Sequence, residues 1–237
     1  MFILCSVLLT RFNCIANQIH AFEDKLSGSN FTWRDGDKRQ VCHPSIYTQP
    51  SSLEELKSIV HSAAVSKEQV KVVGAGHSFS AITLTDDDAA FSVLVNLDKL
   101  NQVLSPPSDA NPSVRVEAGM RIHNLNDYLL SVGFALENMG AIAMQSVAGA
   151  TQTGTHGTGR LTGSMSSLIT HLSLLLANGK IISASSTENE DVFNAARVGL
   201  GALGIIVDLT FAVLPALSCG KLPLLTPLTL FWPPCPR

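Results

Sequence analysis

The chain has little of several features that mark common protein classes. Its 237 residues hold 16 Lys and Arg against 19 Asp and Glu, a formal net charge of −3, without a run of like charge, which argues against a nucleic-acid-binding surface. It also lacks an apolar run of about 20 residues, the length that spans a membrane. The apolar residues 1–9 are too few, and no basic segment precedes them as in a signal peptide. The 46% hydrophobic residues can instead form the core of one large or two small domains.

Metal-ligand patterns are scarce as well, and we predict no metal site. Five cysteines stand far apart, at positions 5, 14, 42, 219 and 235, with no Cys-x-x-Cys pair, which argues against zinc. We expect free thiols, with a disulfide formed in a secretory compartment as the alternative. The run Asp86-Asp87-Asp88 has no spaced partner ligands and is expected to be a solvated turn. Four isolated histidines are expected to be structural or surface residues: His43, His61, His123 and His171.

Hydrophobic periodicity predicts an α+β fold. Helices are expected over residues 52–65, which open on the capping-box pattern Ser-Leu-Glu-Glu, over 122–132, closed by Gly133, and over 190–198. Strands are expected at 70–73, 93–95, 114–117 and 204–214, with a hairpin of 172–177 and 181–184 around Asn178-Gly179. Because helices and strands alternate irregularly, this pattern differs from a doubly wound parallel sheet.

Two segments rich in glycine and small hydroxyl residues, both expected to be loops, carry the functional signal. The first glycine segment, residues 74–80, reads Gly-Ala-Gly-His-Ser-Phe-Ser, and the second, residues 146–159, reads Ser-Val-Ala-Gly-Ala-Thr-Gln-Thr-Gly-Thr-His-Gly-Thr-Gly. Glycine allows close approach of the backbone to a ligand, and consecutive free N–H groups form anion-binding nests. Two such segments in one domain predict a ligand with a diphosphate and a large planar body, as in a dinucleotide cofactor.

Each segment also has a plainer interpretation. The first holds only Gly74 and Gly76, with Phe79 where a dinucleotide fingerprint has its third glycine, so alone it is typical of a tight turn. His77 is a nucleophile when neutral and titrates near pH 7, yet a loop histidine bonded to a backbone carbonyl is the alternative that the residues alone favour. The second segment, with His156 between glycines, resembles a flexible linker, but the apolar residues on both sides argue against that.

Beyond single segments, the chain resembles the flavin-binding domain of the aldonolactone oxidases. This family includes gulonolactone and arabinonolactone oxidases and belongs to the vanillyl-alcohol-oxidase-type flavoproteins. The resemblance extends from about Trp33 to Pro215, and its ordered matches are far more specific than one glycine pattern. They are Val72-Val73-Gly74-Ala75-Gly76-His77-Ser78, Val116-Glu117-Ala118-Gly119, Ser146-Val147-Ala148-Gly149-Ala150, Thr153-Gly154-Thr155-His156-Gly157-Thr158-Gly159, Asp191-Val192-Phe193-Asn194-Ala195-Ala196-Arg197 and Leu203-Gly204-Ile205-Ile206.

The resemblance implies a PCMH-type FAD-binding domain over residues 33–217, with subdomains at about 33–100 and 101–217. It implies that the first segment holds the FAD pyrophosphate, and that His77 carries the covalent link to the flavin 8α-methyl found in many members. Residues 1–32 are expected to be an N-terminal segment, with a weak signal or leader as one interpretation. The implied cofactor-binding residues are Val73, Gly74, Ala75, Gly76, His77, Ser78, Phe79, Ala141, Ser146, Gly149, Ala150, Thr153, Thr155, His156, Gly157, Gly204, Ile205 and Ile206.

The family reaction implied is oxidation of a sugar-1,4-lactone at its C2 hydroxyl, as in ascorbate-type biosynthesis. A hydride passes to flavin N5, and O2 then reoxidises the flavin and yields hydrogen peroxide. The resemblance also implies membrane association, with a secretory or a cytoplasmic location as alternatives. No catalytic residue is identifiable from the sequence.

One departure from the family limits this expectation. Members continue into a substrate-binding domain with a His-Trp-containing motif, whereas residues 218–237 are rich in proline and are expected to be unstructured. Two alternatives to an active lactone oxidase therefore stay open. One is a truncated flavin-binding fragment without catalytic activity, and the other is a related flavoenzyme that acts on another hydroxyl substrate.

Overall fold

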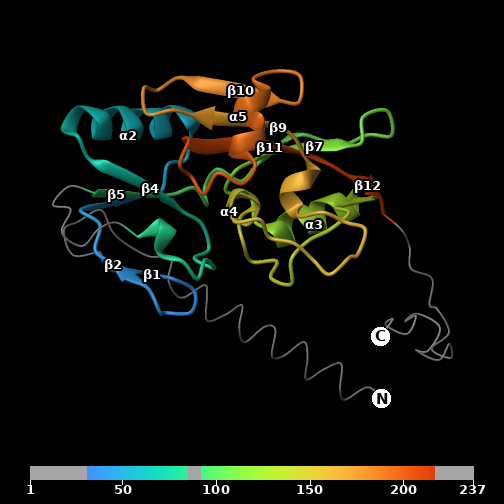
Figure 1. The fold of residues 1–237 in the computed structure, drawn as a ribbon, viewed down its shortest axis with the longest axis horizontal. Helices are drawn as coiled ribbons and strands as arrows, with labels where there is room; N and C mark the ends of the chain where they lie inside the picture. The colour runs from blue at the N-terminus through green and yellow to red at the C-terminus, as the bar shows by residue number, and fades with distance from the viewer. Residues whose placement is uncertain (1–30, 85–91, 217–237) are drawn as a thin grey trace, which may run out of the picture.

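A three-stranded parallel sheet and a five-stranded antiparallel sheet organise the part of the chain that the computed structural model describes, residues 31–84 and 92–216 (Figure 1). One hydrophobic core joins them, because Leu56 and Val95 of the first part belong to the same buried cluster as Leu172 and Leu209 of the second. The architecture is α+β, as the sequence predicts. The expectations for residues 1–30, 86–88 and 218–237 lie outside the described residues.

The parallel sheet has the strand order β3-β5-β4, from Ile46–Thr48, Ser92–Asn96 and Gln69–Val73. All five residues of β5 are buried, as is typical of a parallel strand covered on both faces. Val93 and Val95 pack into the main core, whereas Leu94 packs on the opposite face with Trp33, Cys42 and Val73. This sheet therefore separates two apolar layers.

Helix α2, Leu53–Ser66, connects β3 to β4 and begins where the capping-box pattern predicts. The Ser52 hydroxyl accepts a hydrogen bond from the Glu55 N–H at 3.1 Å, and the Glu55 carboxylate accepts one from the Ser51 N–H at 2.7 Å. The carboxylate thus reaches one residue further back than in the standard box, and it still satisfies a free donor of the helix start. The helix buries Leu56, Val60 and Ala63 against the core.

The antiparallel sheet has the strand order β10-β9-β11-β7-β6. The predicted hairpin is confirmed, and Gly179 at its turn has φ 79°. The central position belongs to β11, which pairs with β9 on one side and β7 on the other. The five strands are β6 (Val103–Ser105), β7 (Ser113–Glu117), β9 (Ile169–Leu175), β10 (Ile181–Ser185) and β11 (Ile205–Ala212).

Three further α-helices and several short elements complete the described part of the chain. The helices expected near 122–132 and 190–198 are α3 (Ile122–Ser131) and α5 (Glu190–Ala196), and Gly133 follows α3 with φ 83°. The third is α4 (Val147–Gln152). The short elements are β1 (Trp33–Arg34), β2 (Val41–Cys42), β8 (Phe134–Ala135), β12 (Leu214–Pro215) and the 3-10 turns η2 (Ala81–Thr83) and η3 (Met165–Leu168).

The long strand expected over residues 204–214 is instead divided in two. Strand β11 ends at Ala212, and β12 pairs with β8 beyond α3 rather than with the large sheet. A continuous apolar run specifies burial but not the pairing partner, so the sequence pattern merges the two strands. Cys42 is a buried free thiol, as expected for it. Within the described ranges, no helix has the length and apolar character that a membrane crossing needs.

Candidate cofactor site

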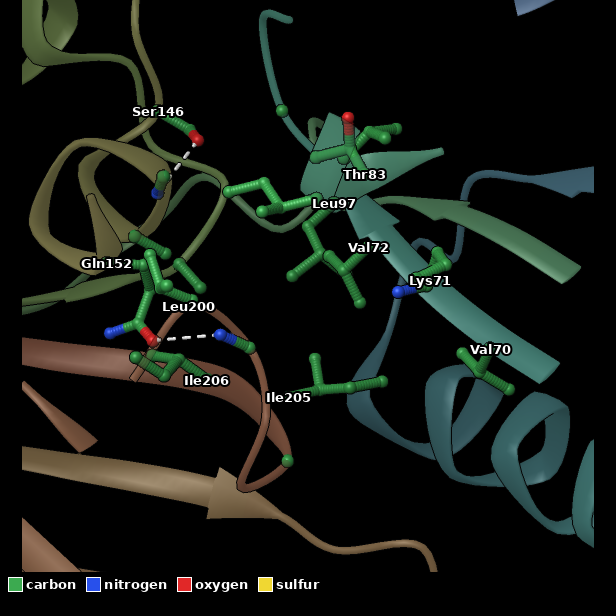
Figure 2. Close-up of a pocket in the computed structure, with 18 of the residues that line it drawn as sticks. Val70, Lys71, Val72, Thr83, Leu97, Ser146, Gln152, Leu200, Ile205 and Ile206 are labelled. Atoms are coloured by element: carbon green, nitrogen blue, oxygen red, sulfur yellow. Dashed lines mark hydrogen bonds between the residues drawn. The ribbon is translucent and has the colours of Figure 1, made fainter. Parts of the chain in front are cut away.

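A cavity of about 620 Å³ lies where the two sheets approach each other. This volume falls within the range of about 300–1,000 Å³ that is typical of ligand pockets. Figure 2 shows Val72 and Leu97 on one side of it, with Leu200, Ile205 and Ile206 on the other and Ser146 and Gln152 from α4 closing one end. Chain segments far apart in sequence thus form its walls.

The first glycine segment leaves the carboxyl end of β4 and lines the cavity from Gly74 to Ser78. A Cβ added at Gly74 would lie 2.3 Å from the Ser146 hydroxyl oxygen, so this loop approaches α4 too closely for any side chain. Gly76 has φ 69°, and a Cβ there would lie 3.1 Å from the Asp35 Cα and from the Trp33 ring. Both glycines are therefore required by geometry, for positive φ or for close approach.

The hairpin of β1 and β2 holds this loop on the side away from the cavity. The Gly36 N–H donates to the Gly76 carbonyl at 2.8 Å. The Gln40 side-chain amide donates to the Phe79 carbonyl at 2.7 Å and to the Ser78 carbonyl at 3.4 Å. The Phe79 ring is largely exposed and lies beneath the Arg39 guanidinium, and it is not part of the cavity wall.

His77 is the titratable side chain of this segment, and it borders the cavity. Its Nε2 atom is buried and has no hydrogen-bond partner among the described residues. Burial lowers the pKa of His77 below its ordinary value of 6.5; the positive charge of Arg121 lowers it further, and Asp37 opposes the shift. The imidazole is therefore neutral at pH 7, the form that can act as a nucleophile.

The second glycine segment is not a loop throughout, which corrects the expectation. Residues 147–152 form α4, and the Ser146 hydroxyl caps it by accepting a hydrogen bond from the Gly149 N–H at 3.3 Å. Small residues hide this helix from periodicity analysis, although a serine before the run is a normal helix-start signal. Ser146, Gly149 and Thr153 line the cavity, whereas Ala150 is fully buried in the core.

Residues 154–159 of that segment lie outside the cavity lining, as does Ala141. A Cβ added at Gly157 would lie 2.7 Å from the Met139 carbonyl oxygen, so this glycine serves close packing of two loops. The His156 Nδ1 lies 2.8 Å from the carbonyl oxygen of Gly157, its neighbour. Six predicted residues lie outside the lining, and their contact with a cofactor stays a prediction. They are Phe79, Ala141, Ala150, Thr155, His156 and Gly157.

The start of β11 forms the cavity wall that faces β4. Gly204, Ile205 and Ile206 all line it, and Gly204 has φ 148° with no room for a Cβ beside the Leu175 carbonyl. Gln152 of α4 supports this wall, because its Oε1 accepts a hydrogen bond from the Gly201 N–H at 3.3 Å (Figure 2). The predicted residues of the first segment, α4 and β11 therefore meet around one space.

The structure adds an ion pair that the sequence pattern did not indicate. Asp98 follows the carboxyl end of β5 and lines the cavity, and its Oδ2 lies 2.5 Å from Nη2 of Arg121. The Nη1 of Arg121 donates to the Met144 carbonyl at 3.0 Å. Asp98 belongs to the part of the chain with the parallel sheet and Arg121 to the other, so the pair links these two parts beside the cavity. A carboxylate two residues after a buried strand was the one available hint.

These features define a cofactor-binding domain of the flavoprotein type. Residues 44–185 match the FAD binding domain family, and the chain belongs to that family. The chain is 44% identical over 176 residues to D-arabinono-1,4-lactone oxidase of Yarrowia lipolytica, which covers 73% of this chain and 32% of that protein. It is 38% identical over 174 residues to L-gulonolactone oxidase of Bos taurus, which covers 73% and 38%.

Two solved structures share the fold. The Physcomitrella patens BBE-like 1 wild-type protein has a TM-score of 0.66 at 24% identity, over 79% of this chain and 39% of that one. A mutant of cholesterol oxidase from Brevibacterium sterolicum has a TM-score of 0.69 at 18% identity, over 78% and 37%. The chain thus spans about a third of the length of the curated relatives that it matches.

FAD is the cofactor of this family, and the residues present fit it. Gly74 and Gly204 line the cavity, and neither has room for a Cβ, because Gly74 packs against Ser146 and Gly204 against the Leu175 carbonyl. Two buried polar atoms on the lining, His77 Nε2 and Asp98 Oδ1, have no partner among the described residues. Apolar side chains of β4 and β11 cover the remaining wall, which suits the flat rings of a dinucleotide.

Proposed function

We propose that this chain forms the FAD-binding part of an oxidase that acts on the C2 hydroxyl of a sugar-1,4-lactone, with O2 as the electron acceptor. The observation that carries the proposal is the single cavity lined by the first glycine segment, α4 and the start of β11, within a chain about 40% identical to proteins named as lactone oxidases. The D-arabinono and L-gulono lactones are the substrates that those names favour.

In this proposal FAD supplies the hydride-accepting chemistry, and the chain supplies binding and orientation. The main chain of Gly74 to Ser78 approaches the diphosphate, because these residues line the cavity and consecutive N–H groups of such a loop can form an anion-binding nest. The apolar side chains of Val72 and Ile206 exclude water from the rings. His77 presents a neutral imidazole at the cavity wall, and we propose it as the attachment point for a covalent flavin.

Cofactor uptake is the first test. The purified 237-residue chain should be yellow, and its flavin fluorescence should persist after acid precipitation if His77 is the attachment point. His77→Ala should abolish the acid-stable signal and keep reversible FAD binding. His156→Ala is the matched control, because His156 lies outside the cavity lining, and it should keep the acid-stable flavin. A folded chain that takes up no FAD would refute the proposal.

Turnover is the second test. Oxygen consumption and peroxide formation should be measured with D-arabinono-, L-gulono- and L-galactono-1,4-lactone, and with an alditol and a hydroxy acid as competing classes of hydroxyl substrate. Turnover with a lactone alone supports the proposed substrate class. FAD uptake without turnover on any of these compounds would confine the function of this chain to cofactor binding.

We also propose that the protein associates with a membrane, as the family resemblance implies. Fractionation of cells that produce the chain, followed by a wash with salt and then detergent, measures this. Recovery of the whole protein from the supernatant before any wash would contradict it.

A further inference from the structure

The β1–β2 hairpin binds three main-chain carbonyls of the first glycine segment. It lies before residue 44, where the family match begins. Its bonds reach the carbonyls of Gly76, Ser78 and Phe79, on both sides of His77. Gly36 also lies against the His77 ring, since a Cβ built on it would be 3.5 Å from Nδ1 and Cε1. The hairpin therefore contacts both the main chain of the loop and the imidazole ring of His77.

Gln40 is the residue of the hairpin whose side chain makes these contacts. The Asp35 carboxylate fixes it in turn, because its Oδ1 accepts a hydrogen bond from the Gln40 N–H at 2.9 Å. Asp35 is itself buried. The Gln40 side-chain amide thus donates to two consecutive carbonyls of the loop. This loop has a glycine at φ 69° and no regular secondary structure. A loop of this kind has few other constraints on its conformation.

We propose that Gln40 is a positioning residue for the cofactor: through the Ser78 and Phe79 carbonyls it holds the first glycine segment in the conformation that turns His77 toward the cavity. The inference rests on the proposed flavin site. Without the two hydrogen bonds, the loop changes conformation and the His77 imidazole becomes more exposed to water. The cavity wall from Gly74 to Ser78 is then displaced.

The test compares Gln40→Met, which keeps the length of the side chain and removes its donor, with Gln49→Met. Gln49 is the matched control, because it is a half-buried glutamine whose amide bonds the Tyr47 hydroxyl at 3.0 Å and does not contact the loop. Two quantities are measured on the full chain: the pKa of His77 by NMR in the protein without flavin, and the affinity for FAD in a His77→Ala background, where binding is reversible.

Gln40→Met should raise the pKa of His77 toward 6.5, because burial is the main cause of its lowered value, and should weaken FAD binding on the order of tenfold. The charged groups near the ring are Arg121, Asp37 and Asp35, and the substitution keeps all three. Gln49→Met should change neither quantity, even if it lowers the melting temperature.

If Gln40→Met does not fold, Gln40→Leu removes the same amide donor with a shorter apolar side chain. The pKa of His77 should rise in that variant too, for the same reason. If His77 keeps its wild-type pKa in a folded variant, the inference is wrong, whichever of the two substitutions is used. A wild-type chain that binds no FAD sinks the proposed function instead, and the titration of His77 still decides the role of Gln40.

Discussion

The two glycine segments look alike in sequence, and the structure uses them differently. From Gly74 to Ser78 the first lines the cavity, and its glycines allow it to pack closely on α4 and on the β1–β2 hairpin. The second begins as a capped helix that lines the cavity, and from Thr155 onward it packs against residues 138–145. A glycine-rich segment can thus either line a cavity or pack two loops together away from it, and sequence alone does not separate these uses.

The largest effect expected from this difference is at Gly74. Gly74→Ala places a methyl group on the Ser146 hydroxyl, so the loop and α4 must separate at the cavity wall. We expect FAD affinity to fall by about 10- to 100-fold, the equivalent of the roughly 1–3 kcal/mol that overpacking costs. Titration with FAD in the His77→Ala background measures this. Unchanged affinity would mean that the first segment does not bind the cofactor.

Gly157→Ala should reverse the pattern. Its Cβ would press on the Met139 carbonyl, a main-chain atom that cannot rotate away. The free energy of unfolding should fall by about 1–3 kcal/mol, whereas the FAD affinity of the folded protein should stay near the wild-type value. Urea denaturation gives the first quantity and titration the second. A selective loss of FAD affinity would instead place Gly157 in the cofactor site, as the family resemblance implies.

Ser146 lies at the contact between the two segments, and its replacement should have a smaller effect. Ser146→Ala removes the cap of α4 and should cost about 1 kcal/mol of stability. It also removes the atom that a side chain at Gly74 would meet, so the double variant Gly74→Ala/Ser146→Ala should bind FAD more tightly than Gly74→Ala alone. Strictly additive losses in this cycle would show that the two residues are not in contact.

The smallest effect concerns Asp37, the charge that opposes the lowered pKa of His77. Asp37→Asn should lower this pKa further, which NMR titration measures. The folded pKa already lies below the unfolded value of 6.5, so the stability contributed by neutral His77 is full above pH 6.5 and declines as the pH falls toward the folded pKa. The variant should extend that decline to lower pH. A rise in the pKa of His77 would show that Asp37 does not face the ring.

Local signals in the sequence predict several parts of the fold. The start of α2 at Ser52 and the hairpin at Gly179 follow from capping and turn chemistry within a few residues. The separation of β11 from β12 was missed, because the pairing of Leu214 with Ala135 joins positions that no local pattern connects. Helix α4 was missed because its residues are nearly all small.

The same limit applies to the site. His77, Gly74 and Gly204 stand in recognisable stretches, and the structure brings them to one cavity. The contributions of Asp98 and Gln40 depend on partners far along the chain, Arg121 and the Ser78 carbonyl, which the sequence around them does not identify. Residues in family-specific stretches are found by pattern, whereas residues that act through distant partners are found by geometry.

Because of the position of β11, the segment that matches the family is shorter than the segment that forms the folded domain. The family match ends at residue 185, yet β11 at Ile205–Ala212 lies between β9 and β7 and joins both halves of the antiparallel sheet. A recombinant segment cut at the limits of the match would leave two inner strands with unpaired edges, which invite aggregation. A recombinant segment for biophysical work should therefore run from before Trp33 to beyond Pro215.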